Sequence, residues 1–262
     1  MTASVMHVTQ LWRHPVKSFQ GEQLIQAIVE GDGIRGDRAW GVRDTDTGRI
    51  LTGRREPRLL LASAHLDGEE LDLHLPTGDT CHGLGADTDT ALSRWLGAPV
   101  VMAAAAGQPA AAAEYFADAT DDTSAPIEWT MPPGRFVDAL PLLVVTTASL
   151  AAGKALHPDG DWDPRRFRAN VVIEADGPPW LEDTWCGQTV RIGDVELDAR
   201  QPCVRCTMVT RPQPGLNRDL DTFRTLARHH GGTFGMWASV RAPGTIRAGD
   251  AVEIIPPHAQ AS

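Results

Sequence analysis

The sequence predicts a mainly β protein with a few helices (α+β), in which an N-terminal β-barrel-like domain precedes a second β-rich domain. Short strand-like stretches recur between turn residues through the first hundred positions, and the same pattern resumes after residue 126. The length of 262 residues, of which 42% are hydrophobic, is enough for one large domain or two modest ones with buried cores.

The first hundred residues are expected to hold short strands and one helix. The helix is expected over Thr88–Leu96, where apolar residues recur at helical spacing and Gly97 follows as a C-cap. The expected strands are His7–Trp12, Gln23–Glu30, Arg38–Arg43, Arg58–Leu66 and Glu70–Leu75, with a turn at Asp46-Thr47-Gly48.

Residues 103–126 interrupt this pattern. The segment contains 11 alanines and four acidic residues but no Lys or Arg. We expect a flexible connection or surface excursion between two domains, although Ala113–Ala119 is compatible with a helical turn. The predicted division is an N-terminal domain over residues 5–102, the connection over 103–126 and a second domain over 127–256.

The second half is expected to alternate strands with two helices. One helix begins near Thr147 as its cap, and the other, over Asp219–His229, presents an apolar face and ends at Gly231-Gly232. The expected strands are Leu140–Thr146, Asn170–Glu174, Thr189–Ile192, Val195–Asp198, Thr207–Arg211 and Met236–Arg241, with a closing hairpin around Gly249-Asp250.

Composition excludes several classes of function. A net charge of −10 argues against nonspecific binding to nucleic acid or to an acidic membrane. No stretch approaches the roughly 18 apolar residues of a membrane span, and the N-terminus lacks the pattern of a signal peptide, so a cytoplasmic location is expected. The four cysteines are too few and scattered for a disulfide framework, and they are expected to be free thiols unless they hold a metal.

The most distinctive motif is the C-x-x-C of Cys203 and Cys206. A structural zinc site normally needs a second ligand pair at comparable spacing, which the sequence lacks. A thioredoxin-like pair would begin a helix, whereas Thr207–Thr210 is expected to continue as a strand. Two interpretations remain open from the residues alone: a single thiolate ligand for a soft metal, with Arg205 beside it, or two buried structural cysteines.

Five short blocks, in order, resemble the MOSC family. Arg166–Ile173, Trp180–Trp185 and Pro202–Cys206 are similar to the blocks of MOSC domains, with Ala169 in place of a usual proline. Pro15–Ser18 and Gly36–Trp40 resemble the β-barrel domain that precedes MOSC in the mitochondrial amidoxime reducing component and its bacterial relatives. The similarity extends from about residue 5 to 255.

The resemblance implies a MOSC β-barrel domain as the second domain and a molybdenum cofactor (Mo-molybdopterin) as the ligand. It implies that Cys206 binds the metal, and that Asp138 lies near the metal, where it accepts a hydrogen bond from the cofactor or moves protons. An Asp that merely forms the turn before Pro141 is the alternative. The residues implied in binding the pterin and its phosphate are Lys17, Arg38, Arg168, Asn170 and Arg205.

The function implied by the resemblance is an oxidoreductase that reduces N-hydroxylated compounds, such as amidoximes or hydroxylamines. The sequence has no four-cysteine iron–sulfur pattern, and it is expected to lack a dinucleotide-binding motif, so a separate electron carrier of the ferredoxin, flavoprotein or cytochrome type is implied. The alternatives are a non-catalytic carrier of the cofactor, a sulfur carrier using a persulfide on Cys206, and a redox step within a biosynthetic pathway.

One architectural consequence is testable in a structure. Lys17 and Arg38 lie far in sequence from Arg168, Arg205 and Cys206, yet all of them are implied in binding one ligand. We therefore expect these side chains to converge on a cleft between the two domains, with the Cys206 sulfur facing into it.

Overall fold

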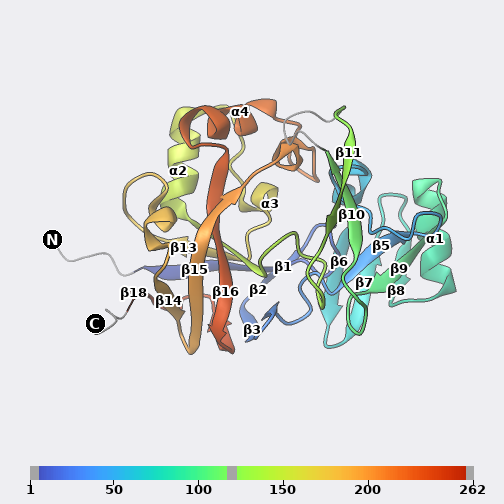
Figure 1. Cartoon of the computed structure of the whole chain (residues 1–262), viewed down its shortest axis with the longest axis horizontal. Coiled ribbons are helices and arrows are strands. Elements are labelled where there is room, and N and C mark those ends of the chain that lie inside the picture. The colour runs from blue at the N-terminus through green and yellow to red at the C-terminus, as the bar shows by residue number, and fades with distance from the viewer. Residues whose placement is uncertain (1–5, 117–122, 258–262) are drawn as a thin grey trace.

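The computed structural model describes residues 6–116 and 123–257. In these residues the fold is rich in strands and has four α-helices (Figure 1). This confirms the predicted α+β class. The strands up to residue 130 are β1 (His7–Arg13), β2 (Glu22–Leu24), β3 (Gln26–Glu30), β4 (Gly33–Ile34), β5 (Trp40–Asp44), β6 (Ser63–Asp67), β7 (Glu70–His74), β8 (Thr80–His82), β9 (Val100–Ala104), β10 (Ala112–Phe116) and β11 (Pro126–Thr130). The later strands are β12 (Leu142–Thr146), β13 (Val171–Glu174), β14 (Thr189–Ile192), β15 (Val195–Val204), β16 (Thr233–Ala242), β17 (Gly244–Arg247) and β18 (Val252–Ile255).

Three of the four described α-helices lie within about two residues of the expected positions, whereas the short helix Pro164–Phe167 was not expected. The α-helices are α1 (Ala86–Leu96), α2 (Thr147–Leu156), α3 (Pro164–Phe167) and α4 (Leu220–His229), and the 3-10 helices are η1 (Pro57–Leu61), η2 (Leu181–Trp185) and η3 (Thr207–Thr210). Gly97 ends α1 in the left-handed conformation, and the Asp219 carboxylate caps α4. The cap of α2 is Thr146, one residue before the expected Thr147. None of the described helices has the length and apolar character needed to cross a membrane.

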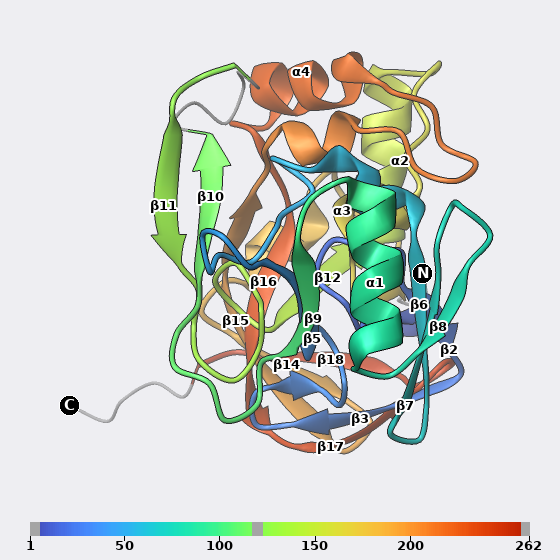
Figure 2. The same cartoon turned by 90° about the vertical axis from the view of Figure 1, so that its right-hand side faces the viewer.

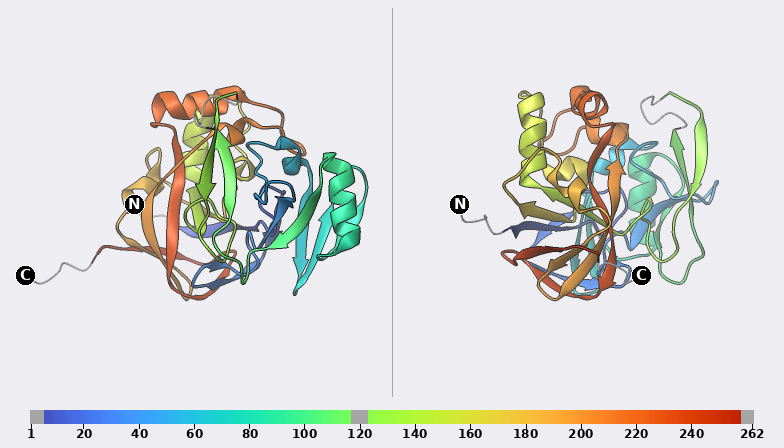
Figure 3. Two further views of the ribbon diagram at one scale, coloured as in Figure 1. Left: turned by 45° about the vertical axis from the view of Figure 1, so that its right-hand side comes forward. Right: turned by 60° about the vertical axis from the view of Figure 1, so that its left-hand side comes forward.

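An eight-stranded sheet forms the centre of the second half, in the order β18-β14-β15-β16-β12-β13-β1-β2. Its pairs are antiparallel except for β12 and β13, which run parallel. Helices α2 and α4 lie together on one side of this sheet (Figure 3). Helix α1 and the smaller sheets of β5–β9 lie in the other part of the molecule (Figure 1), the part that faces the viewer in Figure 2.

The N-terminal strands join the two halves of the chain. Strand β1 pairs with β13, and β3 pairs with β17. Val8 and Leu11 of β1 are therefore buried in the same core as Val144 and Val171, whereas a second core is formed only by residues between Val16 and Met102. The segment predicted as one N-terminal domain, residues 5–102, thus contributes to two hydrophobic cores.

The segment expected to be a flexible connection contains regular structure, which corrects that expectation. Strand β9 extends into it, and Ala112–Phe116 forms β10, neither flexible nor a helical turn, because it pairs along its whole length with β11. The backbone of Ile50 also donates to the Ala112 carbonyl, and Ala113 is fully buried. Residues 117–122 of the expected connection lie outside the described residues.

Two segments expected as strands are 3-10 helices. In the first, Pro57 begins η1 with its φ already fixed, and the Glu56 side chain accepts from the Arg58 amide; the strand begins only with β6. In the second, Thr207–Thr210 forms η3, so the reason given against a thioredoxin-like pair was wrong. The single 3-10 turn after Cys206 is nevertheless far shorter than the helix that such a pair requires.

Glycine turns explain two further differences. The closing turn at Gly249-Asp250 joins β17 to β18, which pair with β3 and β14 and not with each other, so it is not a hairpin. Residues 31–36 do have the G-x-G-x-x-G spacing after a strand, contrary to the expectation from the sequence. They include the turn after β3 and its antiparallel partner β4, and the next element is strand β5, so no helix follows to bind a pyrophosphate.

Because β1 contributes to the core of the second half, shortening a buried side chain of β1 should destabilise the whole chain. Leu11→Ala removes a fully buried side chain, and we expect it to lower the free energy of unfolding by about 2–5 kcal/mol. Ile25→Ala, at a residue that is 88% exposed, serves as the control and should change it by about 0.5 kcal/mol or less. Urea denaturation followed by tryptophan fluorescence measures both values. A Leu11→Ala transition identical to that of the wild type would contradict the shared core.

Candidate functional site

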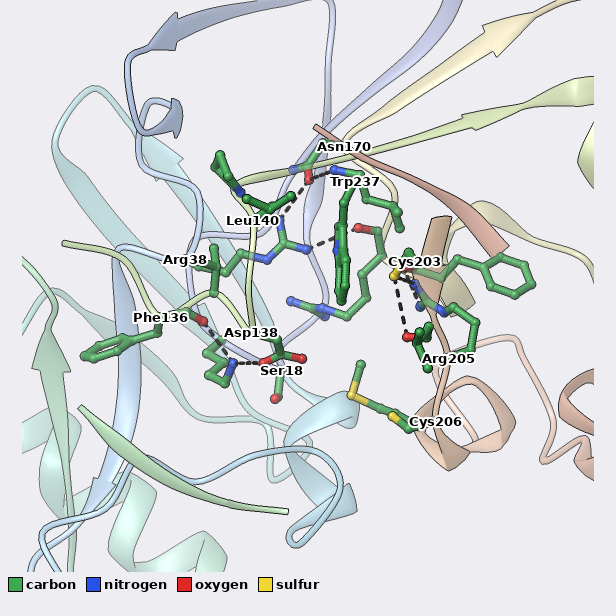
Figure 4. Close-up of a pocket in the computed structure, with 18 of the residues that line it drawn as sticks. Ser18, Arg38, Phe136, Asp138, Leu140, Asn170, Cys203, Arg205, Cys206 and Trp237 are labelled. Carbon is green, nitrogen blue, oxygen red and sulfur yellow. Dashed lines mark hydrogen bonds and ion pairs between the residues drawn. The ribbon is translucent and has the colours of Figure 1, made fainter. Parts of the chain in front are cut away.

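A pocket of about 120 Å³ lies where the two halves meet (Figure 4). Its walls come from the segment after β1, the turn before β5, the segment before β12, the junction of α3 with β13, and the end of β15 with η3. The site residues expected from the sequence all line this one pocket: Lys17, Arg38, Asp138, Arg168, Asn170, Arg205 and Cys206. The expected convergence is therefore present, whereas the roles of these residues toward a ligand stay predictions.

The backbone around the pocket is held in a conformation that side chains rarely adopt. Four non-glycine residues among those described have a left-handed φ, and three of them line the pocket: Ser18 (69°), Arg38 (48°) and Arg168 (57°). Each such residue costs about 1–3 kcal/mol and persists only when its surroundings impose it. At Arg168 the left-handed turn ends α3 and directs the chain into β13. Strain concentrated at one pocket is typical of a ligand-binding site.

Asn170 joins three strands and orients Arg38. Its Oδ1 accepts from the Leu143 amide and from Arg38 Nη1, both at 3.1 Å, and its Nδ2 donates to the Trp12 carbonyl at 3.2 Å. Arg38 also forms an ion pair with the buried Asp37 and donates to the Arg168 carbonyl. The Asn170 amide is thus largely occupied by the protein, and it fixes the guanidinium that lines the pocket.

The pocket is strongly cationic. Five basic side chains line it, and the only carboxylate among its lining residues is that of Asp138. Burial outweighs the attraction of Asp138 and lowers the pKa of Lys17. Burial and the nearby charge of Arg38 lower the pKa of Arg168 to about 9. Burial is the main cause of both shifts, and the neighbouring cations add to it. A bound anion would stabilise the charged forms of these side chains.

Two guanidinium nitrogens in the pocket have no hydrogen-bond partner among the described residues. They are Arg168 Nη2 and Arg205 Nε, both buried. The other nitrogens of these side chains are anchored, since Arg168 Nη1 donates to the Phe19 carbonyl and Arg205 Nη2 to the Phe167 carbonyl. A buried donor without a partner costs about 1–3 kcal/mol, so both atoms suit an anionic ligand such as a phosphate.

Asp138 is an anchored anion. Its Oδ1 accepts from Lys17 Nζ at 2.5 Å and from the Tyr115 hydroxyl at 2.7 Å, and its Oδ2 accepts from Arg54 Nη2 at 2.8 Å. Burial alone would raise the pKa of this carboxyl, but the charges of Arg54 and Lys17 outweigh it and hold the pKa well below its usual range. An ionised carboxyl with three protein donors on its two oxygens argues against the expected role in moving protons. The expected hydrogen bond from a cofactor stays a prediction.

The two cysteines of the motif have different surroundings. Cys203 is buried, and its sulfur accepts from Arg205 Nη1 at 2.9 Å; burial raises the pKa of this thiol. Cys206 is less buried, caps η3, and accepts from Arg54 Nε at 3.0 Å. In the described part of the chain no three His, Cys, Asp or Glu side chains cluster to hold a metal ion.

Sequence reasoning missed three residues that shape the pocket. Arg54 contacts Asp138 and Cys206, Tyr115 donates to Asp138, and Trp237 of β16 forms part of the wall. No local signal identifies Arg54, because it lies in an irregular segment between β5 and η1, and its partners are 84 and 152 positions away. Tyr115 lies inside the segment that composition suggested was flexible.

Comparison with known families and proteins agrees with this architecture. The family model of the MOSC N-terminal beta barrel domain matches residues 5–122, and that of the MOSC domain matches residues 133–253. The chain is therefore a MOSC-domain protein with an N-terminal MOSC β-barrel domain.

Three relatives illustrate the range of similar proteins. Mitochondrial amidoxime-reducing component 1 is 28% identical in mouse and 29% identical in human, in each case over 95% of this chain and 82% of the relative. The molybdenum cofactor sulfurase of Drosophila mojavensis is 27% identical over 88% of this chain but only 31% of its own length. The chain thus corresponds to most of the first two proteins and to one part of the third.

A buried histidine beside the pocket predicts a pH dependence of stability. Burial first, and then the nearby charges of Arg168 and Arg38, lower the pKa of His14 well below 6.5. Its neighbour Asp37 is already engaged, accepting from the His14 amide. The folded state thus keeps the imidazole neutral while the unfolded chain binds a proton below about pH 6.5, so stability is lost as the pH falls below that value.

We expect His14→Gln to flatten this decline between pH 7 and pH 5, where the wild type loses up to about 1.4 kcal/mol per pH unit from this residue. His229→Gln, at an exposed position of α4, is the control. Urea denaturation at several pH values measures the slope. Equal slopes in His14→Gln and the wild type would show that folding does not lower the pKa of His14.

Proposed function

We propose that this protein is a molybdenum-cofactor-dependent oxidoreductase that reduces N-hydroxylated compounds, such as amidoximes or hydroxylamines, with electrons from a separate carrier protein. The observation that carries the proposal is the position of the Cys206 thiol, the less buried of the two thiols that line the pocket, among five cations. A thiolate is a ligand for soft metals, and the cations suit the anionic part of an organic cofactor.

The residues present fit a pterin-bound metal better than a bare ion. The described residues provide no cluster of three metal-ligating side chains, so a single cysteine would complete a coordination sphere that the cofactor itself supplies. The unpartnered nitrogens of Arg168 and Arg205 suit its phosphate. When bound, the cofactor would supply two-electron redox chemistry at the metal.

The residues of the chain would then bind the cofactor and orient it and the substrate. Cys206 would hold the metal, and the ion pairs of Asp138 with Lys17 and Arg54 would keep two cations in fixed positions. Apolar side chains that line the rest of the pocket, including Phe136, Leu143 and Trp237, would exclude water from the reacting atoms and contact the carbon skeleton of a substrate.

The names of the relatives support both parts of the proposal. Two of them are amidoxime-reducing components, and a third is a molybdenum cofactor sulfurase. The chain has neither a four-cysteine iron–sulfur pattern nor a helix after its G-x-G-x-x-G stretch, which supports a separate electron donor.

The enzymatic part of the proposal is tested by turnover. Protein loaded with the cofactor should reduce benzamidoxime to benzamidine with a chemical reductant, as measured by chromatography of the product. Loaded protein that contains molybdenum and pterin but gives no turnover with amidoximes or hydroxylamines would replace the reductase by a carrier of the cofactor.

The proposed binding of molybdenum by Cys206 predicts that the two cysteine variants differ in how much metal they retain. Cys206→Ser should lose most of its molybdenum while the fold is retained, because a hydroxyl is a poorer ligand than a thiolate for a soft metal. Cys203→Ser, a matched control three residues away, should be milder. Metal analysis by mass spectrometry and far-UV circular dichroism measure the two properties. Greater molybdenum loss in Cys203→Ser would overturn the assignment of the ligand.

The proposed contact of Arg168 with the cofactor phosphate predicts that Arg168 and Arg94 variants differ in how much pterin they retain. Arg168→Ala should weaken cofactor binding, since a hydrogen bond between a buried charge and an anion contributes about 1.5–3 kcal/mol. Arg94→Ala, at an exposed position of α1, should have little effect because exposed charges contribute about 0–1 kcal/mol. Fluorescence of the oxidised pterin released from each variant measures retention. Equal pterin content would remove Arg168 from the site.

A further inference from the structure

Arg54 is the side chain that connects the Cys206 sulfur to the rest of the pocket. Its Nε donates to Cys206 Sγ at 3.0 Å, and its Nη2 donates to Asp138 Oδ2 at 2.8 Å. The side chain is 15% exposed. Two nitrogens of one planar group thus contact the sulfur and the carboxylate at the same time, which a flexible single-point cation cannot do.

The orientation of this guanidinium is fixed from a second direction. Its central carbon lies 4.1 Å from the centre of the Tyr115 ring, and the Tyr115 hydroxyl donates to the same carboxyl group that Arg54 contacts. The Trp129 indole donates to the Asp138 carbonyl at 2.9 Å. The antiparallel pair of strands β10 and β11, which carries Tyr115 and Trp129, therefore contacts both Asp138 and Arg54.

The backbone that carries Arg54 is anchored as well. The Gly53 amide donates to Ser18 Oγ at 2.8 Å, and Ser18 is one of the strained residues of the pocket. A Cβ at Gly53 would lie 3.3 to 3.4 Å from Leu60, Met208 and Ser18, so the segment already packs closely. Contacts therefore fix both the backbone that carries Arg54 and the guanidinium at the end of its side chain.

We propose that Arg54 is a positioning residue for Cys206: its Nε–H fixes the direction of the sulfur and withdraws electron density from it, which raises the reduction potential of a metal bound there. This inference rests on the proposed function, because it assigns a role toward the metal that Cys206 would hold. Hydrogen bonds to ligating sulfurs raise the reduction potentials of metal centres in general. Asp138 and Tyr115 then act through Arg54 and not on the metal.

The test separates the charge of Arg54 from its fork of donors. Arg54→Lys keeps a positive charge beside Asp138 but cannot donate to the carboxylate and the sulfur in the same geometry. Arg54→Gln removes the charge as well. Tyr115→Phe keeps the ring under the guanidinium but removes the hydroxyl that donates to Asp138. Arg58→Lys, an exposed arginine of η1 that pairs with Glu56, is the matched control.

Metal analysis, potentiometric titration and electron paramagnetic resonance of the half-reduced molybdenum are measured on each loaded variant. We expect Arg54→Lys to retain molybdenum within about twofold of the wild type, the fold-change that corresponds to about 0.4 kcal/mol. Its midpoint potential should nevertheless be lower and its resonance spectrum altered. Tyr115→Phe should shift the potential in the same direction by less, and Arg58→Lys should match the wild type.

The outcomes distinguish this inference from the proposed function. A molybdenum-loaded Arg54→Lys protein with the potential and spectrum of the wild type would overturn the positioning role and leave the proposed function intact. Wild-type protein that binds no molybdenum would overturn both. A shift in Arg54→Gln without one in Arg54→Lys would assign the effect to charge alone and reject the hydrogen bond.

Discussion

The mutual repulsion of five cations around one pocket is the constraint on which the site depends. The chain as a whole carries a net charge of −10, yet Lys17, Arg38, Arg54, Arg168 and Arg205 meet where a single lining carboxylate is available. In water-excluded surroundings such charges are stable only when fixed hydrogen bonds and counterions compensate them. Asp138 compensates two of them and Asp37 a third, which leaves Arg168 and Arg205 with unpartnered nitrogens that suit an anion.

The fold brings these charges together because the N-terminal strands belong to both halves. Strand β1 is paired in the large sheet, and the residues that follow it, Lys17 and Ser18, reach the pocket at the end of that strand. Asn170 at the start of β13 holds β12 and Arg38 through its side-chain oxygen. Backbone strain at the pocket is then maintained by the surrounding sheet and cores, as expected where ligand binding and not stability determines the conformation.

The parts of the fold that were predictable have a local cause. The helix ending at Gly97 and the hairpin of β14 and β15 follow from caps, turns and periodicity within a dozen residues. Strand Ala112–Phe116 was not predicted, because an alanine-rich composition does not indicate its pairing with β11 or its contact with Ile50. At η3, the apolar and β-branched residues of Thr207–Thr210 suggested a strand, but after Cys206 they are buried as a tight turn beside α4.

In the candidate site, too, only residues with a local sequence pattern could be predicted. The positions of Lys17, Arg38, Arg168 and Cys206 could be named from short blocks, because each block carries its own residue pattern. Arg54 could not, since its importance comes from atoms that only the fold places near it. Asp138 was named as a residue near the metal, but its three hydrogen-bond donors, and hence its ionised state, needed the structure.

The central claim is that Cys206 binds a metal whose cofactor is held by the cationic pocket. A crystal structure of the molybdenum-loaded protein, with diffraction recorded above and below the molybdenum absorption edge, tests it most directly. We predict one anomalous peak within bonding distance of Cys206 Sγ, and an anionic group in contact with Arg168 and Arg205. A molybdenum peak at Cys203, Cys186 or Cys81, or a cofactor bound away from this pocket, would contradict it.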